Sequence, residues 1–394
     1  MTNQASGAKL PRPPFECIAL LLQGGGALGA YQAGIYEALA ESGLEPNWIA
    51  GISIGAINAA IIAGNPPETR VQNLRKFWEE ITTPCFGSQS LGPVAGMLHD
   101  GSGRSLMNAA SAYAALMNGV NNFFSPRTLT PWLNKKGSVD ATSYYDTSKL
   151  KTTLERLIDF DRINAKEMRF CAGAVNVRTG NFIYFDTDTH TICPEHIMAS
   201  SALPPAFPAV EIDGEYYWDG GLVSNTPLQW MVDSVPRLDT LAFQVDLWSA
   251  DSPLPRDMAE VMTRTKEIQY SSRTRDHTDR FKRIQKFRYA FAKLLEELPE
   301  ELKNTPEAEL LGTTANRKVY NLVHMIYHAR DYEGPSKDFE FSCTSMQEHW
   351  QSGYHDMHHT LEHTEILQRP TNAEGIQTFD FSEENMKYCK LRSA

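Results

Sequence analysis

The feature that most constrains this sequence is a serine between two glycines, the segment GISIG at 51–55, which directly follows a short apolar run. The small and aliphatic residues 56–62 come next and predict a helix. Gly-x-Ser-x-Gly between a strand and a helix is typical of a nucleophile elbow, a sharp turn that exposes the serine hydroxyl at the helix N-terminus. Gly51 and Gly55 would be needed because a Cβ there would clash with the neighbouring strand or helix. The sequence therefore predicts an α/β fold with Ser53 as a candidate nucleophile.

A second glycine turn lies one predicted strand–helix unit earlier. The apolar residues 17–22 predict a strand, and the segment QGGGALG follows at 23–29. Glycines at the start of a helix leave backbone N–H groups open to a substrate, where they can stabilise a developing negative charge. Because a strand–helix–strand unit makes parallel neighbours, both turns should meet at the carboxyl edge of one sheet, where open α/β folds bind ligands.

The same glycine turn also fits a dinucleotide-binding fingerprint. Gly24, Gly26 and Gly29 have the spacing Gly-x-Gly-x-x-Gly. That fingerprint requires an acidic residue at the end of the next strand, and here the next strand ends in the serine turn instead. Either motif alone also occurs by chance. Together, at this spacing, they favour acyl transfer over nucleotide binding.

A second informative block lies further along the chain. Residues 195–202 predict a helix that stops before two prolines, and residues 210–218 predict two strands joined at an Asp-Gly turn. Asp219 then precedes Gly220 and Gly221, so it should lie at a strand end beside a backbone turn. An aspartate before glycines is most often a turn former. Its place after the other motifs makes it a candidate site residue.

These motifs, in this order, resemble those of the patatin-like phospholipases, in particular bacterial members with an extra C-terminal region. The resemblance covers about residues 15–248 and includes the run Ala-Ser-x-Ala-x-Pro at 199–204. It implies a three-layer α/β/α fold with a mainly parallel central sheet. It also implies a serine acyl hydrolase that cleaves lipid esters, of phospholipase A or lysophospholipase type, with a serine–aspartate dyad that lacks histidine.

By position, the resemblance implies that Ser53 is the nucleophile and Asp219 the general base. It implies that the amides of Gly25 and Gly26 form the oxyanion hole. The family's loop usually reads Gly-Gly-Gly-x-Arg-Gly, and Leu28 stands here in place of the arginine. We therefore expect weak preference for anionic head groups.

The chain divides into three predicted parts. Residues 1–14 should form a flexible N-terminal segment, and residues 15–248 the catalytic domain. The glycine- and serine-rich stretch of about 84–140 is interpreted as an insertion that covers the active-site edge, or else as an ordinary peripheral lobe. Residues 249–394 should form a largely helical extension packed on or next to the catalytic domain.

Two patterns in the extension allow further interpretations. A helix predicted over about 257–298 holds eight basic and two acidic residues between 273 and 293, so it could contact a membrane surface. Its apolar side chains form a stripe on one face, and such a stripe more often packs on the protein's own core. The stripe consists of Phe281, Ile284, Phe287, Phe291 and Leu294. A second predicted helix, to about Leu367, should open with a capping box at Ser345 and Glu348. Its histidines recur at metal-binding spacing, but no acidic or cysteine ligand completes the set, so we expect no metal and no cofactor. These histidines are His355, His358, His359 and His363.

Composition limits the partners and the compartment. A net charge of −11 argues against nucleic acid and against passive attraction to anionic membranes. Six cysteines without a C-x-x-C pair predict reduced thiols in a cytoplasmic protein, with peripheral membrane contact as an option. The expected partner is a lipid or phospholipid substrate, and the oligomeric state is left open.

Two other functions compete with the dyad hydrolase. One is a Ser–His–Asp esterase of α/β-hydrolase type that uses one of the histidines after residue 220. The other is a non-catalytic lipid-binding protein. Dependence on histidine separates the first from the dyad, and reactivity of Ser53 separates the second.

Overall fold

The computed structural model describes residues 10–82 and 101–382. The first nine residues of the predicted flexible segment and the first part of the predicted insertion lie outside the described residues. Among residues 10–82 and 101–382, no helix is both long and apolar enough to cross a membrane.

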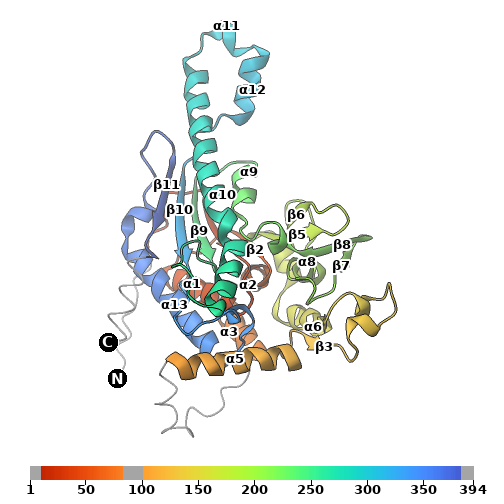
Figure 1. Ribbon diagram of the computed structural model, residues 1–394. Helices are drawn as coiled ribbons and strands as arrows, with labels where there is room; N and C mark the ends of the chain where they lie inside the picture. The colour runs from red at the N-terminus through yellow and green to blue at the C-terminus, as the bar shows by residue number, and fades with distance from the viewer. Residues whose placement is uncertain (1–9, 83–100, 383–394) are drawn as a thin grey trace.

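The described residues build a mixed sheet around which the molecule is arranged (Figure 1). Its order is β11–β10–β9–β1–β2–β5–β8–β7, with β6 also paired to β5. The six strands from β11 to β5 are parallel, whereas β6, β7 and β8 run antiparallel to their neighbours. The strands are β1 (Cys17–Leu22), β2 (Trp48–Ile52), β5 (Arg169–Asn176), β6 (Phe182–Asp186), β7 (Val210–Ile212), β8 (Glu215–Asp219), β9 (Thr240–Asp246), β10 (Tyr320–Ile326) and β11 (Ile376–Asp380), with a separate pair β3 (Ser125–Pro126) and β4 (Tyr145–Asp146). The predicted mainly parallel α/β fold is confirmed.

Helices lie on both faces of the sheet, and others extend beyond it (Figure 1). They are α1 (Ala30–Ser42), α2 (Ile54–Ala63), α3 (Pro67–Ile81), α5 (Gly101–Asn118), α6 (Ser148–Leu157), α7 (Phe160–Asn164), α8 (Pro194–Ser200), α9 (Leu228–Asp233), α10 (Met258–Glu297), α11 (Glu300–Lys303), α12 (Pro306–Thr314) and α13 (Cys343–Glu362). The 3₁₀ turns are η1 (Gly26–Gly29), η2 (Pro131–Leu133), η3 (Val139–Ala141), η4 (Gly220–Leu222), η5 (Lys337–Phe339) and η6 (Thr364–Leu367).

Strand β1 shows how the three layers form. Its alternate side chains enter two different cores: Ile18, Leu20 and Leu22 pack with α1, α2, α3 and α13, whereas Ala19 and Leu21 pack with α9 and α10. A strand buried on both faces reads as a continuous apolar run, which is the pattern of residues 17–22.

The C-terminal residues are built into this fold. Strands β10 and β11 extend the central sheet beyond β9. Helices α13 and α1 cross with their backbones in contact, and a glycine at the crossing point of each helix makes this possible. A Cβ on Gly34 would lie 1.9 Å from the carbonyl oxygen of Trp350, and a Cβ on Gly353 would lie 2.0 Å from the carbonyl oxygen of Tyr31. The two helices lie side by side in Figure 1. The region after residue 249 therefore shares the core of the first half of the chain.

Three local predictions need correction. Helix α13 begins at Cys343, and its N-cap is Ser342, whose hydroxyl accepts from the N–H of Ser345. The predicted capping box placed the start three residues too late. Ser342 has the same capping hydroxyl as the predicted cap, Ser345. The prediction of reduced thiols holds for Cys17, Cys171 and Cys193, which are free. It fails for Cys343, which is disulfide-bonded.

The apolar stripe predicted on the 273–293 helix does not pack on the core along its whole length, since Phe281 is fully buried and Phe287 is 53% exposed.

Candidate active site

The serine turn has the backbone strain of a nucleophile elbow. Ser53 lies between β2 and α2 with φ 57° and ψ −128°, a positive φ that a non-glycine residue rarely adopts. A Cβ on Gly51 would lie 2.2 Å from the carbonyl oxygen of Gly55, and one on Gly55 would lie 2.4 Å from that of Leu22. Neither glycine can therefore be replaced without moving the backbone that holds Ser53.

Two further serines hold this turn from the end of α8. The backbone N–H of Ser53 donates to both the hydroxyl and the carbonyl oxygen of Ser200, each at 3.1 Å. The hydroxyl of Ser201 donates to the carbonyl oxygen of Ser53 at 3.1 Å. The run that the sequence shows at 199–204 thus fixes both peptide groups of the strained residue.

The glycine loop lies against the elbow because β1 and β2 end side by side, with Leu22 paired to Gly51. Gly24 is close enough that a Cβ on it would lie 3.0 Å from Cβ of Ser53. Within the described residues, the N–H groups of Gly25 and Gly26 have no hydrogen-bond acceptor. Both glycines line the same cavity as Ser53, so these N–H groups can donate to a ligand bound there.

Two side chains orient the first of these N–H groups. The carbonyl oxygen of Gly24 accepts from Nδ2 of Asn225 at 2.9 Å and from Nε1 of Trp248 at 3.0 Å. In a trans peptide the C=O and the following N–H point in opposite directions. Holding the Gly24 carbonyl therefore fixes the direction of the Gly25 N–H.

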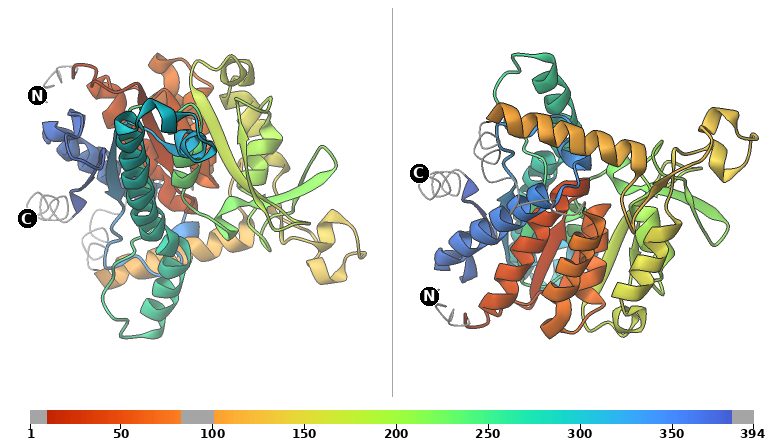
Figure 2. Two further views of the ribbon diagram at one scale, coloured as in Figure 1. Left: turned by 90° about the horizontal axis from the view of Figure 1, so that it is seen from above. Right: turned by 90° about the horizontal axis from the view of Figure 1, so that it is seen from below.

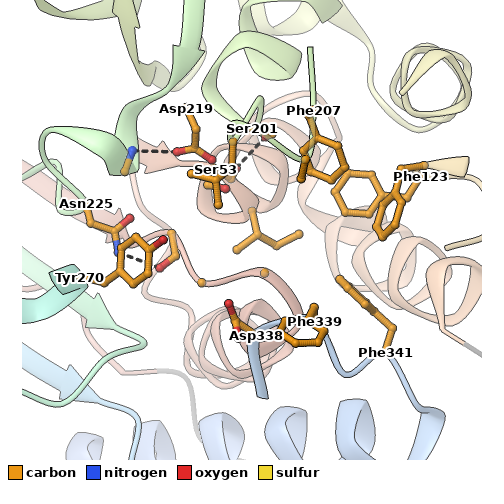
Figure 3. A pocket seen from close by; sticks show the side chains of 18 of the residues that line it. Ser53, Phe123, Ser201, Phe207, Asp219, Asn225, Tyr270, Asp338, Phe339 and Phe341 are labelled. Carbon is orange, nitrogen blue, oxygen red and sulfur yellow. Dashed lines mark hydrogen bonds between the residues drawn. The ribbon is translucent and has the colours of Figure 1, made fainter. Parts of the chain in front are cut away.

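The sheet register brings Asp219 to Ser53. Ile52 pairs with Gly173, and the next residue of β5, Ala174, pairs with Asp219 at the end of β8. The Asp219 carboxylate accepts from the N–H of Gly221 at 2.7 Å, and the Ser53 side chain lies close enough to lower the pKa of that carboxyl group. Figure 3 shows both side chains at the centre of the site.

The environment of Asp219 changes its acidity. The residue is 1% exposed, and this burial raises the pKa of its carboxyl group to about 7 from an ordinary 3.8, against the lowering effect of the nearby Ser53 side chain and of the hydrogen bond from Gly221. A carboxylate with a pKa near neutrality is a far better base toward a hydroxyl than a free aspartate.

Ser53 and Asp219 face a cavity of about 220 Å³ with a mostly apolar lining. One wall is a cluster of aromatic rings whose members come from distant segments, Phe123, Phe124, Phe207 and Phe341. The ring of Phe339 also lines the cavity, beside Asp338, whose carboxylate pairs with Lys266 at 2.7 Å. Figure 3 shows the aromatic rings on one side of Ser53 and Asn225 with Tyr270 on the other. No histidine, lysine or arginine is among the described residues that line the cavity.

Several of these residues were not identified from the sequence. Asn225 follows the Asp-Gly-Gly turn by four positions, which is a local signal that could have been used. Trp248, Phe207, Phe339 and Phe341 lie in no motif, and only the fold brings them to the glycine loop. Leu28 is fully buried in the core, so its side chain does not face the substrate.

The predicted histidine-rich helix corresponds to α13. Among residues 10–82 and 101–382, no group of three or more histidine, cysteine or acidic side chains is arranged to hold a metal ion. His363 instead stacks on Phe381 with ring centroids 4.0 Å apart.

Comparison with known families identifies the class. Residues 20–231 match the family model described as patatin-like phospholipase, and residues 268–373 match a second model described as patatin phospholipase. The first match covers more than half of the chain, so this protein belongs to the patatin-like phospholipase family. Membership of this family supports hydrolysis of lipid esters as the activity of the protein.

Individual relatives are matched over short segments. Stretches of 68 and 65 residues are each 44% identical to patatin-like phospholipase domain-containing protein 7 of Rattus norvegicus and of Mus musculus. The match to the rat protein covers 17% of this chain and 5% of that protein, so it spans a small part of either one.

Two solved structures are distantly similar. VipD from Legionella pneumophila has a TM-score of 0.38 at 13% sequence identity, and the superposition covers 99% of this chain and 79% of the VipD chain. The ExoU–SpcU complex of Pseudomonas aeruginosa has a TM-score of 0.28 at 18% identity, over 69% of this chain and 52% of that one. At these values neither structure informs the site.

Proposed function

We propose that this protein hydrolyses carboxylic esters of lipids, as a phospholipase A or lysophospholipase, with Ser53 as nucleophile and Asp219 as general base. The observation that carries the proposal is that Ser53, on a strained turn, and the buried Asp219 line one cavity, with the Ser53 side chain next to a carboxyl group whose pKa is about 7. The unpartnered N–H groups of Gly25 and Gly26 support an oxyanion hole beside that pair.

The reaction would proceed through an acyl-enzyme. Asp219 takes the hydroxyl proton as Oγ of Ser53 attacks the ester carbonyl, and the negative charge that forms on the carbonyl oxygen is held by the N–H groups of Gly25 and Gly26. The C–O bond to the alcohol then breaks, and Asp219 returns the proton to that oxygen. Water, activated by the same carboxylate, attacks the acyl-enzyme and releases the fatty acid and free Ser53.

The cavity favours an apolar acyl chain. Its lining is mostly aromatic and aliphatic, and within the described lining no basic side chain offers a charge to an anionic head group. Leu28, at the position of the family's usual arginine, is apolar and buried, so it supplies none either. We infer that zwitterionic and neutral esters are accepted at least as well as anionic ones.

The cavity also suggests how the parts of the chain cooperate. We infer that residues 15–248 supply the reacting groups and that the extension, residues 249–394, completes the pocket through Tyr270, Phe339 and Phe341. A Cβ on Gly26 would lie 2.0 Å from the carbonyl oxygen of Asp338, so the extension also packs directly on the glycine loop.

A lipid panel tests the proposed function. Purified protein and a Ser53→Ala variant would be incubated with phosphatidylcholine, lysophosphatidylcholine, phosphatidylglycerol and triacylglycerol, and released fatty acids measured by mass spectrometry. We expect release from at least one phospholipid or lysophospholipid that depends on Ser53. No Ser53-dependent release from any lipid would favour the non-catalytic lipid-binding protein.

The orienting role of Trp248 is testable with a conservative change. Trp248→Phe keeps the aromatic ring but removes the N–H that holds the Gly24 carbonyl. We expect kcat on a monomeric ester to fall roughly tenfold with KM little changed, because an oxyanion contact acts in the transition state. The matched control is Trp350→Phe, which removes a hydrogen bond to Glu37 outside the cavity and should leave kcat unchanged. Equal effects of the two changes would contradict the role.

The esterase with a histidine triad is tested by single His→Ala variants. The eight histidines after residue 220 are His277, His324, His328, His349, His355, His358, His359 and His363. None lines the cavity, so each variant that keeps the wild-type melting temperature should retain most of its ester hydrolysis. If a folded histidine variant is as inactive as Ser53→Ala, the mechanism uses a Ser–His–Asp triad and not the proposed dyad.

A further inference from the structure

Helix α5 carries its large apolar side chains on the outside. Leu106, Tyr113 and Met117 are 73%, 65% and 57% exposed, and their spacing of seven and four residues puts them on one side of the helix. The buried side is formed by the smaller residues Asn108, Ala112 and Ala115. A helix that packs on its own core through alanines and an asparagine and exposes leucine, tyrosine and methionine has the reverse of the usual arrangement.

The exposed side of this helix is also uncharged. Arg104 is the one charged residue in 101–118, and its guanidinium is directed inward, 2.9 Å from the carboxylate of Glu348. Ordinary solvent-facing helices carry charged and polar residues on this side. The outer surface of α5 is therefore suited to an apolar neighbour rather than to water.

The lobe that follows α5 also exposes large apolar side chains, close in sequence to the exposed Lys135 and Lys136. Leu129, Trp132 and Leu133 are 53%, 85% and 73% exposed. Figure 1 shows α5 along the lower edge of the molecule with this lobe beyond its C-terminal end, and the right panel of Figure 2 shows both from below. We call these side chains the apolar face; its members are Leu106, Tyr113, Met117, Leu129, Trp132 and Leu133.

The apolar face is continuous with the catalytic cavity. Leu116 lines the cavity and is 42% exposed, more than any other lining residue, and it immediately precedes Met117 of the apolar face. The hydroxyl of Tyr145, another lining residue, donates to the carbonyl oxygen of Leu116 at 2.8 Å. The end of α5 thus forms both the rim of the cavity and part of the exposed surface.

We propose that the apolar face inserts into the surface of a lipid bilayer or micelle and brings the cavity rim to the substrate; this inference rests on the proposed lipid hydrolase function. A lipid surface fits because the outer side of α5 is apolar and uncharged and its C-terminal end forms the rim of an apolar cavity. With a net charge of −11 on the protein, attraction to anionic lipid is not the driving force. Binding should therefore occur on zwitterionic vesicles and depend little on salt.

This surface differs from the one expected from the sequence. The basic helix segment 273–293 belongs to α10, whose Phe281 is buried, while Phe287 and Leu294 are 53% and 49% exposed. Those two side chains belong to the part of α10 that leads to α11 and α12, at the opposite end of the molecule from α5 (Figure 1). The two surfaces can be tested against each other.

The test uses two matched triple variants. Leu106→Gln, Tyr113→Gln and Met117→Gln change the apolar face; Phe287→Gln, Leu294→Gln and Leu310→Gln change exposed residues of α10 and α12. Glutamine keeps helix propensity, and Leu116 is left intact because it lines the cavity. Binding is measured by co-sedimentation with phosphatidylcholine vesicles at low and high salt, in a Ser53→Ala background so that hydrolysis plays no part. Activity is measured separately on a monomeric short-chain ester with Ser53 present.

We expect the α5 variant to bind vesicles at least about tenfold more weakly, since three large apolar side chains leave the lipid, with unchanged melting temperature and unchanged hydrolysis of the monomeric ester. The α10–α12 variant should bind like its parent. Vesicle binding that is lost only in the α10–α12 variant, or that requires anionic lipid and disappears with salt, would overturn the proposal. So would a parent protein that binds no vesicles but forms a dimer that the α5 changes dissociate. Failure of the proposed function is distinguishable, because it would abolish hydrolysis of the monomeric ester in every variant.

Discussion

The Ser53→Ala variant is expected to lose hydrolysis of a monomeric ester by about 10⁴-fold or more, because no other group can form the acyl-enzyme. The fold should persist. The hydroxyl of Ser53 is not a packing group, and the turn is held through the backbone N–H and carbonyl oxygen by Ser200 and Ser201. The measurement is initial rate on a chromogenic ester, with circular dichroism to check the fold.

A matched control is Ser201→Ala, which removes a hydroxyl that lines the same cavity but donates to the backbone of Ser53. This variant should be impaired much less than Ser53→Ala. Unchanged turnover in pure, folded Ser53→Ala would remove Ser53 from the mechanism.

The second large effect is expected for Asp219→Asn. The amide keeps the shape and can still accept from the N–H of Gly221, but it cannot take the proton from Ser53. We expect kcat to fall by roughly 10²-fold or more, within the usual range for a general base. Asp338→Asn is the control, since Asp338 is a cavity carboxylate paired with Lys266 and has no part in the proposed reaction.

The raised pKa of Asp219 gives this prediction a pH signature. The base must be ionised to act, so kcat/KM of the wild-type protein should rise about tenfold per pH unit up to about 7 and level off above it. The residual activity of Asp219→Asn should lack that step. A wild-type profile without a step between pH 6 and 8 would contradict the assignment of the base.

The same carboxyl group should make stability depend on pH. Because the pKa is higher in the folded state, about 7 against 3.8, the folded protein binds more protons, and the free energy of unfolding falls as pH rises between these values. Asp219→Asn removes this loss and should be more stable than wild type at pH 8, by up to about 4 kcal/mol at about 1.4 kcal/mol per pH unit. At pH 4 the difference should vanish. Thermal melting at the two pH values checks it.

Much of the fold and the candidate site follows from local sequence. The run at 17–22 is apolar at every position because β1 is buried on both faces, and the glycines at 51 and 55 are required by contacts under 2.5 Å. Asp219 is followed by two glycines and comes directly after an alternating pattern, which predicts its position at the end of a strand. Such features are encoded by neighbouring residues, so a sequence pattern reveals them.

What the sequence did not reveal depends on contacts between distant segments. Phe341 meets Phe123 only because α13 packs on α1 and carries its preceding loop to the cavity. Trp248 reaches the Gly24 carbonyl because β9 lies beside β1, a pairing between residues more than 200 positions apart. The outer side of α5 was missed for a different reason: periodicity predicts an amphipathic helix but not which side faces the core, and here the small side does.

The most direct test of the central claim is covalent labelling with a fluorophosphonate, which reacts with a serine that is activated as a nucleophile. Mass spectrometry of digested protein should place one adduct on Ser53. The labelling rate should fall in Asp219→Asn and remain near wild type in the folded histidine variants. Labelling of another serine, or a Ser53 adduct whose rate depends on a histidine and not on Asp219, would contradict the dyad.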